Sequence, residues 1–440
     1  MTLLSKVVTA CAVAALATVG TSALAAEVEA PVISAATLSQ AEALSIFRAR
    51  GLDLLIADAA VRSAEGEAAV ASRIANPQVS VGVGPTFNYD ASAPGCSGCS
   101  RLSVQAAIGD SGAIVDVVSG KRRLRSEIAD AALASARLDR ADASRVLSSL
   151  VKQAYTRVAV AKKSLDQARA VQQLLAQAVA LAKLRYPAVI TEGDLARTEV
   201  QKLRGDSDVT IAVSALRQAQ AELAFLLGAR TVAPDFQVDE LTFFVAPELQ
   251  QASERELVAL ALRERPDLRA RAYDRTRALA ALALARRQVM PDVQLAAQYS
   301  GIGSGQDAAS PGALVWSASA NLPVFSQRQG EIEKANAALT VATLTRARAE
   351  AIVSAEVAAS YADFDARRRA VVRMNSGLLA RASAARDILE LQYNAGTASL
   401  VDFLDAQRTF ISIHQQYAAD LGAYWIAVEQ LEQSLGVELR

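Results

Sequence analysis

Two aspartates near the C-terminus, Asp402 and Asp405, have the spacing with the clearest chemical meaning in this sequence. Residues three apart lie on one face of a helix, so the two carboxylates would project to the same side. Where several copies of such a helix meet around an axis, the carboxylates form an acidic ring that attracts cations and resists closure by mutual repulsion. The alternative is a solvated helix N-terminus, where aspartate is favourable because of the helix macrodipole.

Cys96 and Cys99 form a second pattern, a CxxC pair in a turn that is rich in glycine and serine. In an exported protein a disulfide within this turn is the first interpretation, and capture of a metal by two thiolates is the second. A lone CxxC is a weak zinc signal because a closed zinc site needs about four ligands. His414, the only histidine, is predicted to be a surface residue of a helix rather than a ligand.

Residues for enzymatic chemistry are missing from the sequence. Gly82 and Gly84 lack the third glycine and the following helix of a dinucleotide fingerprint, and no nucleophile elbow, phosphate loop or HExxH pattern occurs. The 46 basic and 46 acidic residues cancel, which removes the electrostatic argument for a nucleic-acid partner. We therefore predict no catalytic site, no cofactor, no metal site and no nucleic-acid binding.

The N-terminus is typical of an export signal. Lys6 precedes an apolar stretch, residues 7–19, and the small residues Ala23 and Ala25 suit a signal peptidase. The stretch is shorter than the roughly 20 residues that span a bilayer. We predict a cleavable signal peptide over residues 1–25, and no lipid anchor, because no cysteine follows the cleavage site.

After this signal the chain has no apolar run of about 18 residues, so any membrane crossing must be made by strands. Four segments alternate apolar with small or polar residues, as strands with one apolar face do. Each is close to the roughly 9 to 11 residues of a barrel-crossing strand. Ordinary soluble hairpins with a half-buried face are the alternative. The four segments are residues 78–84, 101–108, 292–300 and 314–322.

The order of helix, hairpin and long helical stretch occurs twice along the chain. Pro77 at the start of the first hairpin matches Pro291, 214 positions later, at the start of the second. Small changes of offset further along fall at loops, where insertions are tolerated. The predicted boundaries are a first repeat over residues 26–230 with a hairpin at about 78–108, a linker over 231–252, and a second repeat over 253–440 with a hairpin at about 292–322.

Two helical stretches, residues 115–185 and 329–393, contain no breaker other than isolated glycines. Each would extend about 100 Å, a length that needs neighbouring helices to bury its apolar stripe. The final segment has such a stripe at spacings of three or four, and two consecutive fours relax left-handed supercoiling. The stripe comprises Phe410, Ile413, Tyr417, Leu421, Tyr424, Val428, Leu431 and Leu435.

Four strands per chain cannot close a barrel, because the smallest barrels have about eight. The open strand edges therefore require partner subunits. Two chains would give a narrow barrel filled with side chains, whereas three would give twelve strands and a lumen wide enough for a solute. The strand pattern allows a dimer or a trimer, and a role as a conduit favours the trimer.

The duplicated order resembles the TolC-type outer membrane efflux proteins over essentially the whole mature chain. The resemblance implies a mainly α fold with a membrane β-barrel, in which four strands per chain close as a twelve-stranded barrel in a homotrimer. It also implies a long α-helical tunnel in the periplasm below the outer membrane lipid. The motifs that carry it are Gly120-Lys121-Arg122-Arg123, Leu322-Pro323-Val324-Phe325, and the run from Gln392 to Thr397 that leads into Val401 to Gln407.

The same resemblance implies a periplasmic tip where the helices converge and close the channel. It maps a pair of gate aspartates onto Asp402 and Asp405. The chain departs from the best-known member in having Ala398 where that protein has a gate-linking arginine, so its latch contacts must differ. The tip-turn residues that the resemblance implies are Tyr393, Gly396 and Thr397 in the second repeat and Tyr186 and Asp194 in the first.

In the first repeat Asp194 aligns with Asp402, but Arg197 aligns with Asp405. The first repeat is therefore not expected to extend the acidic ring.

The expected function is a passive exit duct, opened when a periplasmic adaptor and a proton-driven inner-membrane pump engage the helical tip. Gly120-Lys121-Arg122 resembles the CzcC-like heavy-metal branch, so heavy-metal cations are the expected solute. Drug efflux and type I protein secretion are neighbouring alternatives. A soluble periplasmic coiled-coil scaffold is a more distant one, because it would not need four amphipathic strands.

Overall fold

The computed structural model describes most of the chain. The predicted signal peptide and the Cys96 and Cys99 pair lie outside the described residues, so the structure does not test them. The described residues are 37–85, 92, 102–186, 191–230, 236–245, 249, 253–301 and 313–438.

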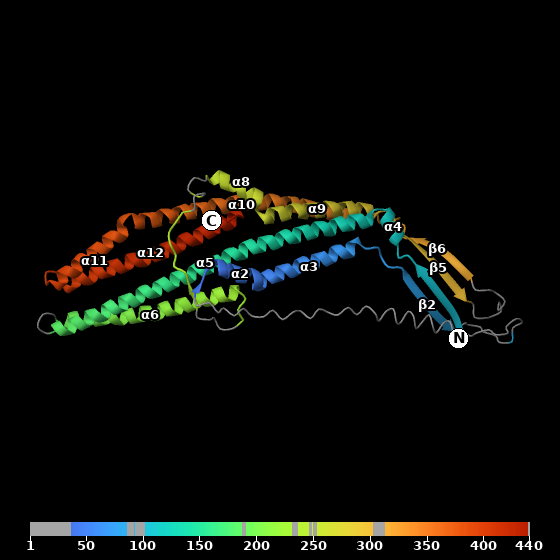
Figure 1. The fold of residues 1–440 in the computed structure, drawn as a ribbon. Coiled ribbons are helices and arrows are strands. Elements are labelled where there is room, and N and C mark those ends of the chain that lie inside the picture. Colours follow the sequence, from blue (N-terminus) through green and yellow to red (C-terminus); the bar gives the residue numbers. More distant parts are fainter. Residues whose placement is uncertain are drawn as a thin grey trace.

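The order of elements confirms two repeats of helix, hairpin and long helices in a mainly helical chain (Figure 1). The first repeat contains β1 (Thr37–Leu38), α2 (Gln40–Arg50), α3 (Leu52–Ser72), β2 (Gln78–Pro85), β3 (Leu102–Gly109), α4 (Ala113–Val118), α5 (Lys121–Arg185) and α6 (Glu192–Leu226). The second contains α8 (Glu254–Glu264), α9 (Pro266–Arg287), β5 (Val293–Gly301), β6 (Ala313–Ala320), α10 (Gln329–Arg373), the π-helical segment η1 (Met374–Leu378), α11 (Leu379–Asn394) and α12 (Leu400–Leu435).

Matching capping boxes begin corresponding helices in the two repeats. Ser39 caps α2 and Ser253 caps α8, each by accepting the backbone N–H three residues on, while the glutamate at that position bonds back. Such a box satisfies two of the N–H groups that a helix N-terminus leaves without a partner in the helix. The repeat in the sequence is therefore also a repeat of local structure.

The four predicted strands form one antiparallel sheet in the order β2, β3, β5, β6. The two hairpins meet through β3 and β5, where Ala106 pairs with Tyr299. The sheet lies at one end of the molecule, beyond the helices (Figure 1). The outer edges of β2 and β6 have no strand beside them in the described chain.

The register places apolar side chains on one face of this sheet, as the alternation predicts. Val81 pairs with Ala106, and Ala297 pairs with Trp316. This face is open in the single chain, since Val81 is 65% and Trp316 is 78% exposed. The opposite face carries glutamine, serine, glycine and small apolar residues, and no charged residue occupies a position within the four strands.

The predicted long helices are present, but glycine interrupts both. Gly120 has φ 74° and separates α4 from α5, so the first uninterrupted helix begins at Lys121 and runs for 65 residues. In the second repeat, η1 interrupts the helix, and Gly377 within it has φ 152°. The expectation that isolated glycines leave the helices continuous was wrong, because glycine tolerates positive φ at little steric cost.

A side chain and a backbone loop fix the junction between sheet and helices. The buried Lys121 donates from Nζ to the Met290 carbonyl and to Asp292 Oδ1, both at 2.7 Å. Asp110 accepts from the N–H groups of Gly112 and Ile114 at the start of α4. Lys121 thus ties α5 of the first repeat to the residues that lead into β5 of the second.

Each repeat has its own apolar core, and the segment between them belongs to both. β4 (Gln237–Val238) pairs in parallel with β1, a short strand pair that the sequence did not predict. Residues 241–245 then cross to the second core, where the Thr242 carbonyl accepts from Trp425 and the Phe244 carbonyl accepts from Tyr424. Leu241 contacts both cores. The predicted linker therefore connects the two cores. We call its described part, residues 236–245, the strap.

Among the described helices, none is both long enough and apolar enough to cross a bilayer.

Tyr155 provides a test of how the strap is held. Its hydroxyl donates to the Leu38 carbonyl and accepts from the Asp239 N–H, both at 3.0 Å. We expect Tyr155→Phe to lower the free energy of unfolding by about 1–3 kcal/mol, because buried backbone groups lose their partner. Denaturant unfolding followed by circular dichroism measures this. Tyr273→Phe, at an exposed position of α9, is the control and should change little.

The pH dependence of the same variant has a defined sign. Burial raises the pKa of Tyr155 to about 12. The unfolded chain would lose this proton near pH 10 while the native protein keeps it, so stability falls as the pH rises from about 10 through 12. This part of the alkaline loss should disappear in Tyr155→Phe. An identical alkaline profile in both proteins would contradict the assignment.

Candidate functional site

The ends of the two helical coils lie together at the end of the molecule opposite the sheet (Figure 1). One end is the turn from α5 to α6 and the other is the turn from α11 to α12. All the predicted tip residues lie in or beside these two turns, so the chain brings them to one end although they come from different repeats.

A short sequence of hydrogen bonds builds the α11–α12 turn. Gly396 has φ 79°, a conformation in which glycine ends the helix without strain. Thr397 then bonds back through both its N–H and its hydroxyl to the Gln392 carbonyl, at 2.9 and 3.0 Å. Ser399 caps α12 through a capping box with Asp402. Gly396 and Thr397 therefore shape the turn itself.

Two stacked aromatic rings, one from α11 and one from α12, flank this turn. The rings of Tyr393 and Phe403 lie 5.0 Å apart between centroids and are nearly parallel, at 9°. Tyr393 is 5% exposed. Such a pair contributes about 0.5–1.5 kcal/mol beyond its buried area. The role of Phe403 was not predicted, although an aromatic residue on each side of a short turn is a signal that the sequence does contain.

The two candidate gate aspartates differ in their surroundings. Asp402 is part of the capping box, where its Oδ2 accepts from the Ser399 hydroxyl at 2.7 Å and from the Ser399 N–H at 3.3 Å. Asp405 lies one turn further on, exposed to solvent, with the buried Leu404 and Ala406 on either side. Within the described residues no side chain pairs with the Asp405 carboxylate.

The α5–α6 turn has the same cap but a different charge. Thr191 caps α6 through a capping box with Asp194. Arg197 lies 4.0 Å from the Asp194 carboxylate, where the second repeat has Asp405. Tyr186 is the C-cap of α5 and is 42% exposed. The first tip therefore has a positive charge, on Arg197, at the position where the second tip has the negative charge of Asp405.

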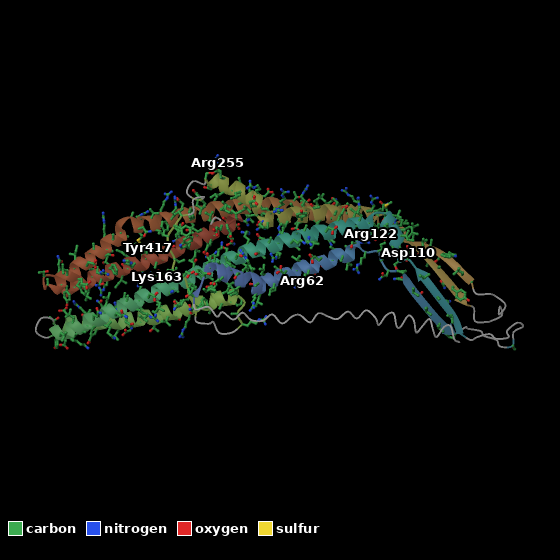
Figure 2. The ribbon with its side chains drawn as sticks, viewed as in Figure 1. Arg62, Asp110, Arg122, Lys163, Arg255 and Tyr417 are labelled. Atoms are coloured by element: carbon green, nitrogen blue, oxygen red, sulfur yellow. The ribbon has the colours of Figure 1, made fainter. Side chains whose placement is uncertain are left out.

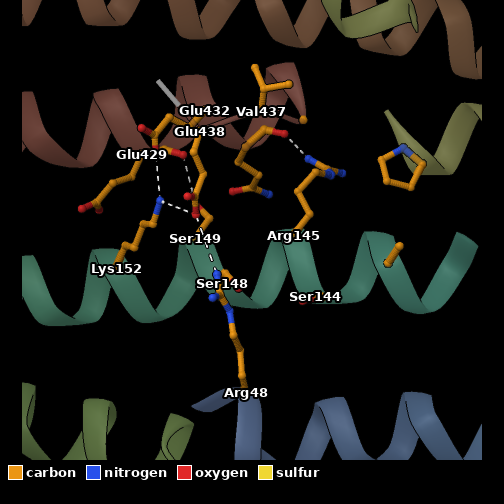
Figure 3. A pocket seen from close by; sticks show the side chains of 14 residues that line it. Arg48, Ser144, Arg145, Ser148, Ser149, Lys152, Glu429, Glu432, Val437 and Glu438 are labelled. Carbon is orange, nitrogen blue, oxygen red and sulfur yellow. Dashed lines mark hydrogen bonds and ion pairs between the residues drawn. The ribbon is translucent and has the colours of Figure 1, made fainter. Parts of the chain in front are cut away.

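A second group of charges lies midway along the molecule, between α5 and α12, around a cavity of about 260 Å³ (Figure 3). Lys152 binds Glu432 at 2.9 Å and Glu438 at 3.4 Å, and all but the Glu438 side chain are buried. Thr156 and Gln40 donate to Glu429 Oε1, both at 3.2 Å. These pairings hold α2 and α5 to α12.

Metal ligands do not gather in the described part of the chain, where no group of three or more His, Cys, Asp or Glu residues could hold an ion. His414, predicted to be a surface residue of a helix, is on α12 and is half-buried. Its ring lies between helices, and its Nε2 atom is buried.

Comparison with known proteins finds a family similarity over most of the second repeat. Residues 257–437 match the family model described as outer membrane efflux protein. No curated protein matches the chain significantly.

Solved structures of outer membrane channels share the fold over almost the whole chain. OprN has a TM-score of 0.73 at 20% identity, and the match covers 91% of this chain and 90% of that one. VceC from Vibrio cholerae has a TM-score of 0.74 at 18% identity, covering 91% and 97%. The open state of MtrE from Neisseria gonorrhoeae has a TM-score of 0.72 at 18% identity, covering 94% and 95%.

The cap of α12 can be tested independently of any transport activity. We expect Ser399→Ala to cost about 1 kcal/mol locally, because the first-turn N–H groups lose their acceptor. Amide hydrogen exchange in residues 400–405 should then be about fivefold faster. Ser412→Ala is the matched control, because the Ser412 hydroxyl bonds only to its own helix at Thr409. Equal exchange in the two variants would contradict a capping role.

Proposed function

We propose that this protein acts as the homotrimeric exit duct of a tripartite efflux system, because residues 257–437 match the family model described as outer membrane efflux protein and the chain shares the fold of solved outer membrane channels. Proteins of this family are channels and not enzymes. The duct is passive, and an inner-membrane proton-driven pump supplies the energy through a periplasmic adaptor.

The observation that carries the trimer is the open, two-faced sheet. Its apolar face is exposed over all four strands, and the edges of β2 and β6 are unpaired among the described strands. Lipid can cover such a face, but unpaired backbone groups in a bilayer each cost several kcal/mol. Three copies pair every edge and close twelve strands around a lumen.

The uncharged inner face gives the barrel section little means of selecting by charge. Gln105, Gln298 and Ser317 occupy this face. Charge selection is then left to the helical tip, where three copies of α12 would bring together three Asp405 carboxylates and, next to them, the three Asp402 carboxylates of the capping boxes. Such a ring attracts cations and raises the free energy of the closed state through repulsion.

The proposed solute is a heavy-metal cation. Support comes from the resemblance of Gly120-Lys121-Arg122 to the CzcC-like branch and from the acidic tip, which favours cations over anions. A strain that lacks the gene should become sensitive to divalent heavy-metal ions and should regain resistance on complementation. Sensitivity to drugs alone would assign the duct to drug efflux instead.

The two faces of the sheet can be distinguished by a matched pair of variants. Val81→Arg places a charge on the apolar face and should cost about 2–4 kcal/mol in the bilayer. Ser80→Arg, one residue away, points to the opposite face and should be tolerated. The measurement is the yield of trimer extracted from the outer membrane and its mass in detergent. A soluble monomer, or equal effects of both variants, would contradict the proposal.

The acidic tip can be tested by ion selectivity in planar bilayers. Replacing Asp402 and Asp405 together by asparagine keeps a cap acceptor but removes the charge, so cation preference and block by multivalent cations should both decrease. Asp194→Asn is the matched control, because Asp194 occupies the same cap position and has Arg197 beside it. Unchanged selectivity in the double variant would refute a gate at these residues.

A further inference from the structure

The only histidine of the chain lies where three helices and the strap meet. His414 is on α12 and lines a cavity of about 240 Å³ together with Gln167 of α5, Leu379 of α11 and Leu241 of the strap. Lys163 and Tyr417 line the same cavity from the facing helices and mark its position in Figure 2. The cavity therefore lies between the long helix of the first repeat, α5, and the α11–α12 coil of the second.

The imidazole is half-buried, and its Nε2 atom is shielded from water. Its ring centroid lies 4.2 Å from that of Phe410, and the Arg386 guanidinium lies 4.2 Å over the other ring. Nε2 is buried and has no hydrogen-bond partner among the described residues. The Gln167 side chain donates to the His414 carbonyl at 3.3 Å, so α5 approaches α12 at this very residue.

The charged groups around the ring oppose its protonation. Burial has the largest effect in lowering the pKa of His414, followed by the positive charges of Arg386 on α11 and Lys163 on α5. The other titratable groups that line the cavity are Lys162 and Asp166 on α5, Asp239 and Glu240 on the strap, and Tyr417 on α12.

The nearby carboxylates are partly occupied by other partners. Glu240 lies 3.7 Å from Lys163, and Asp387 pairs with Arg386. Asp239 accepts from Tyr155 at 3.4 Å. The cations thus keep their ion pairs, while a charged imidazole would be left with a buried N–H.

A weak point in the helix lies beside this cavity. η1 ends at Leu378, immediately before Leu379 of the cavity wall. Gly377 in η1 has φ 152° and nothing within 4 Å of where a Cβ would be. Beyond η1, α11 packs mainly on α12. The α11–α12 coil can therefore pivot at η1 if its contact with α5 weakens.

We propose that His414 is a proton-sensitive latch, in which protonation of the imidazole loosens α12 from α5 and lets the α11–α12 coil swing at η1. Given the proposed duct function, this movement opens the helical tip in an acidic periplasm. The sign follows from linkage: the packed state binds the proton less well than a state with a solvated ring. The packed state keeps its full stability above pH 6.5. It loses stability as the pH falls through the lowered pKa of His414 in the native protein.

The titration of His414 can be followed directly in the full-length protein. Because the sequence has a single histidine, the ring signal of ¹³C-histidine-labelled protein, purified without a histidine tag, is assigned without mutagenesis. We expect an apparent pKa below that of a free histidine. Lys163→Gln should raise it, because one of the opposing charges is removed. A native pKa at or above the free value overturns the proposal.

The loosening is measured by amide hydrogen exchange of residues 407–421 at pH 7.5 and 5.5, corrected for intrinsic rates. Wild type should exchange about three- to tenfold faster at the lower pH. His414→Gln, which keeps a polar side chain but does not titrate, should abolish this difference, and His414→Asn is the second variant if the first does not fold. A pH effect that persists in either folded variant refutes the latch.

Conductance separates the latch from the duct. Acid-dependent opening of wild type in planar bilayers, absent in His414→Gln, supports both. If hydrogen exchange depends on acid but no conductance is found, the proposed latch is supported and the proposed duct function is contradicted. Conductance with no difference between wild type and variant at either pH keeps the duct and overturns the latch's role in opening.

Discussion

The two repeats are held together by the packing of α5 against α9 and α12, and the contact with α12 is the one that extends towards the tip. Gly422 makes it close, since a Cβ at that position would collide with the Val160 side chain. The buried Lys152 and Glu432 then fix the register of the two helices at 2.9 Å. A buried pair of this kind contributes little net stability, but losing one partner leaves a buried charge and is strongly destabilising. The pair therefore acts against any sliding of one repeat along the other, and among the described residues no second buried ion pair joins α5 to α12 nearer the tip.

The two repeats share an architecture and differ where movement would occur. The first coil has an uninterrupted helix of 65 residues, and its tip pairs Asp194 with Arg197. The second coil has η1 in one helix and the exposed Asp405 at its tip. The kink at η1 and the exposed charge of Asp405 thus lie in the same half of the molecule. This difference suits a subunit in which the α5–α6 coil stays in place and the α11–α12 coil moves. Two identical halves would not provide it.

The strap limits how far this movement can spread. Its backbone carbonyls accept from Tyr424 and Trp425, and its residues contact both cores. The cavity at His414 lies between the strap and η1, so the contacts that protonation weakens are those nearest to the pivot. At the other end, Lys121 binds the start of β5 to α5 and keeps the sheet fixed to the helices. Movement is therefore expected at the tip and not at the sheet.

The sequence by itself determined the elements, because their signals are local. Alternating valines predict β2, the spacing of Tyr424, Val428 and Leu431 predicts a buried helix face, and Pro77 and Pro291 mark the repeat. Only the tertiary structure decided which glycines break helices, since Gly120 and Gly377 differ from their tolerated neighbours in φ and not in type. The pairing of β1 with β4 and the burial of the His414 Nε2 atom were also beyond the sequence. Both depend on contacts between segments that lie far apart along the chain, and no local pattern records such contacts.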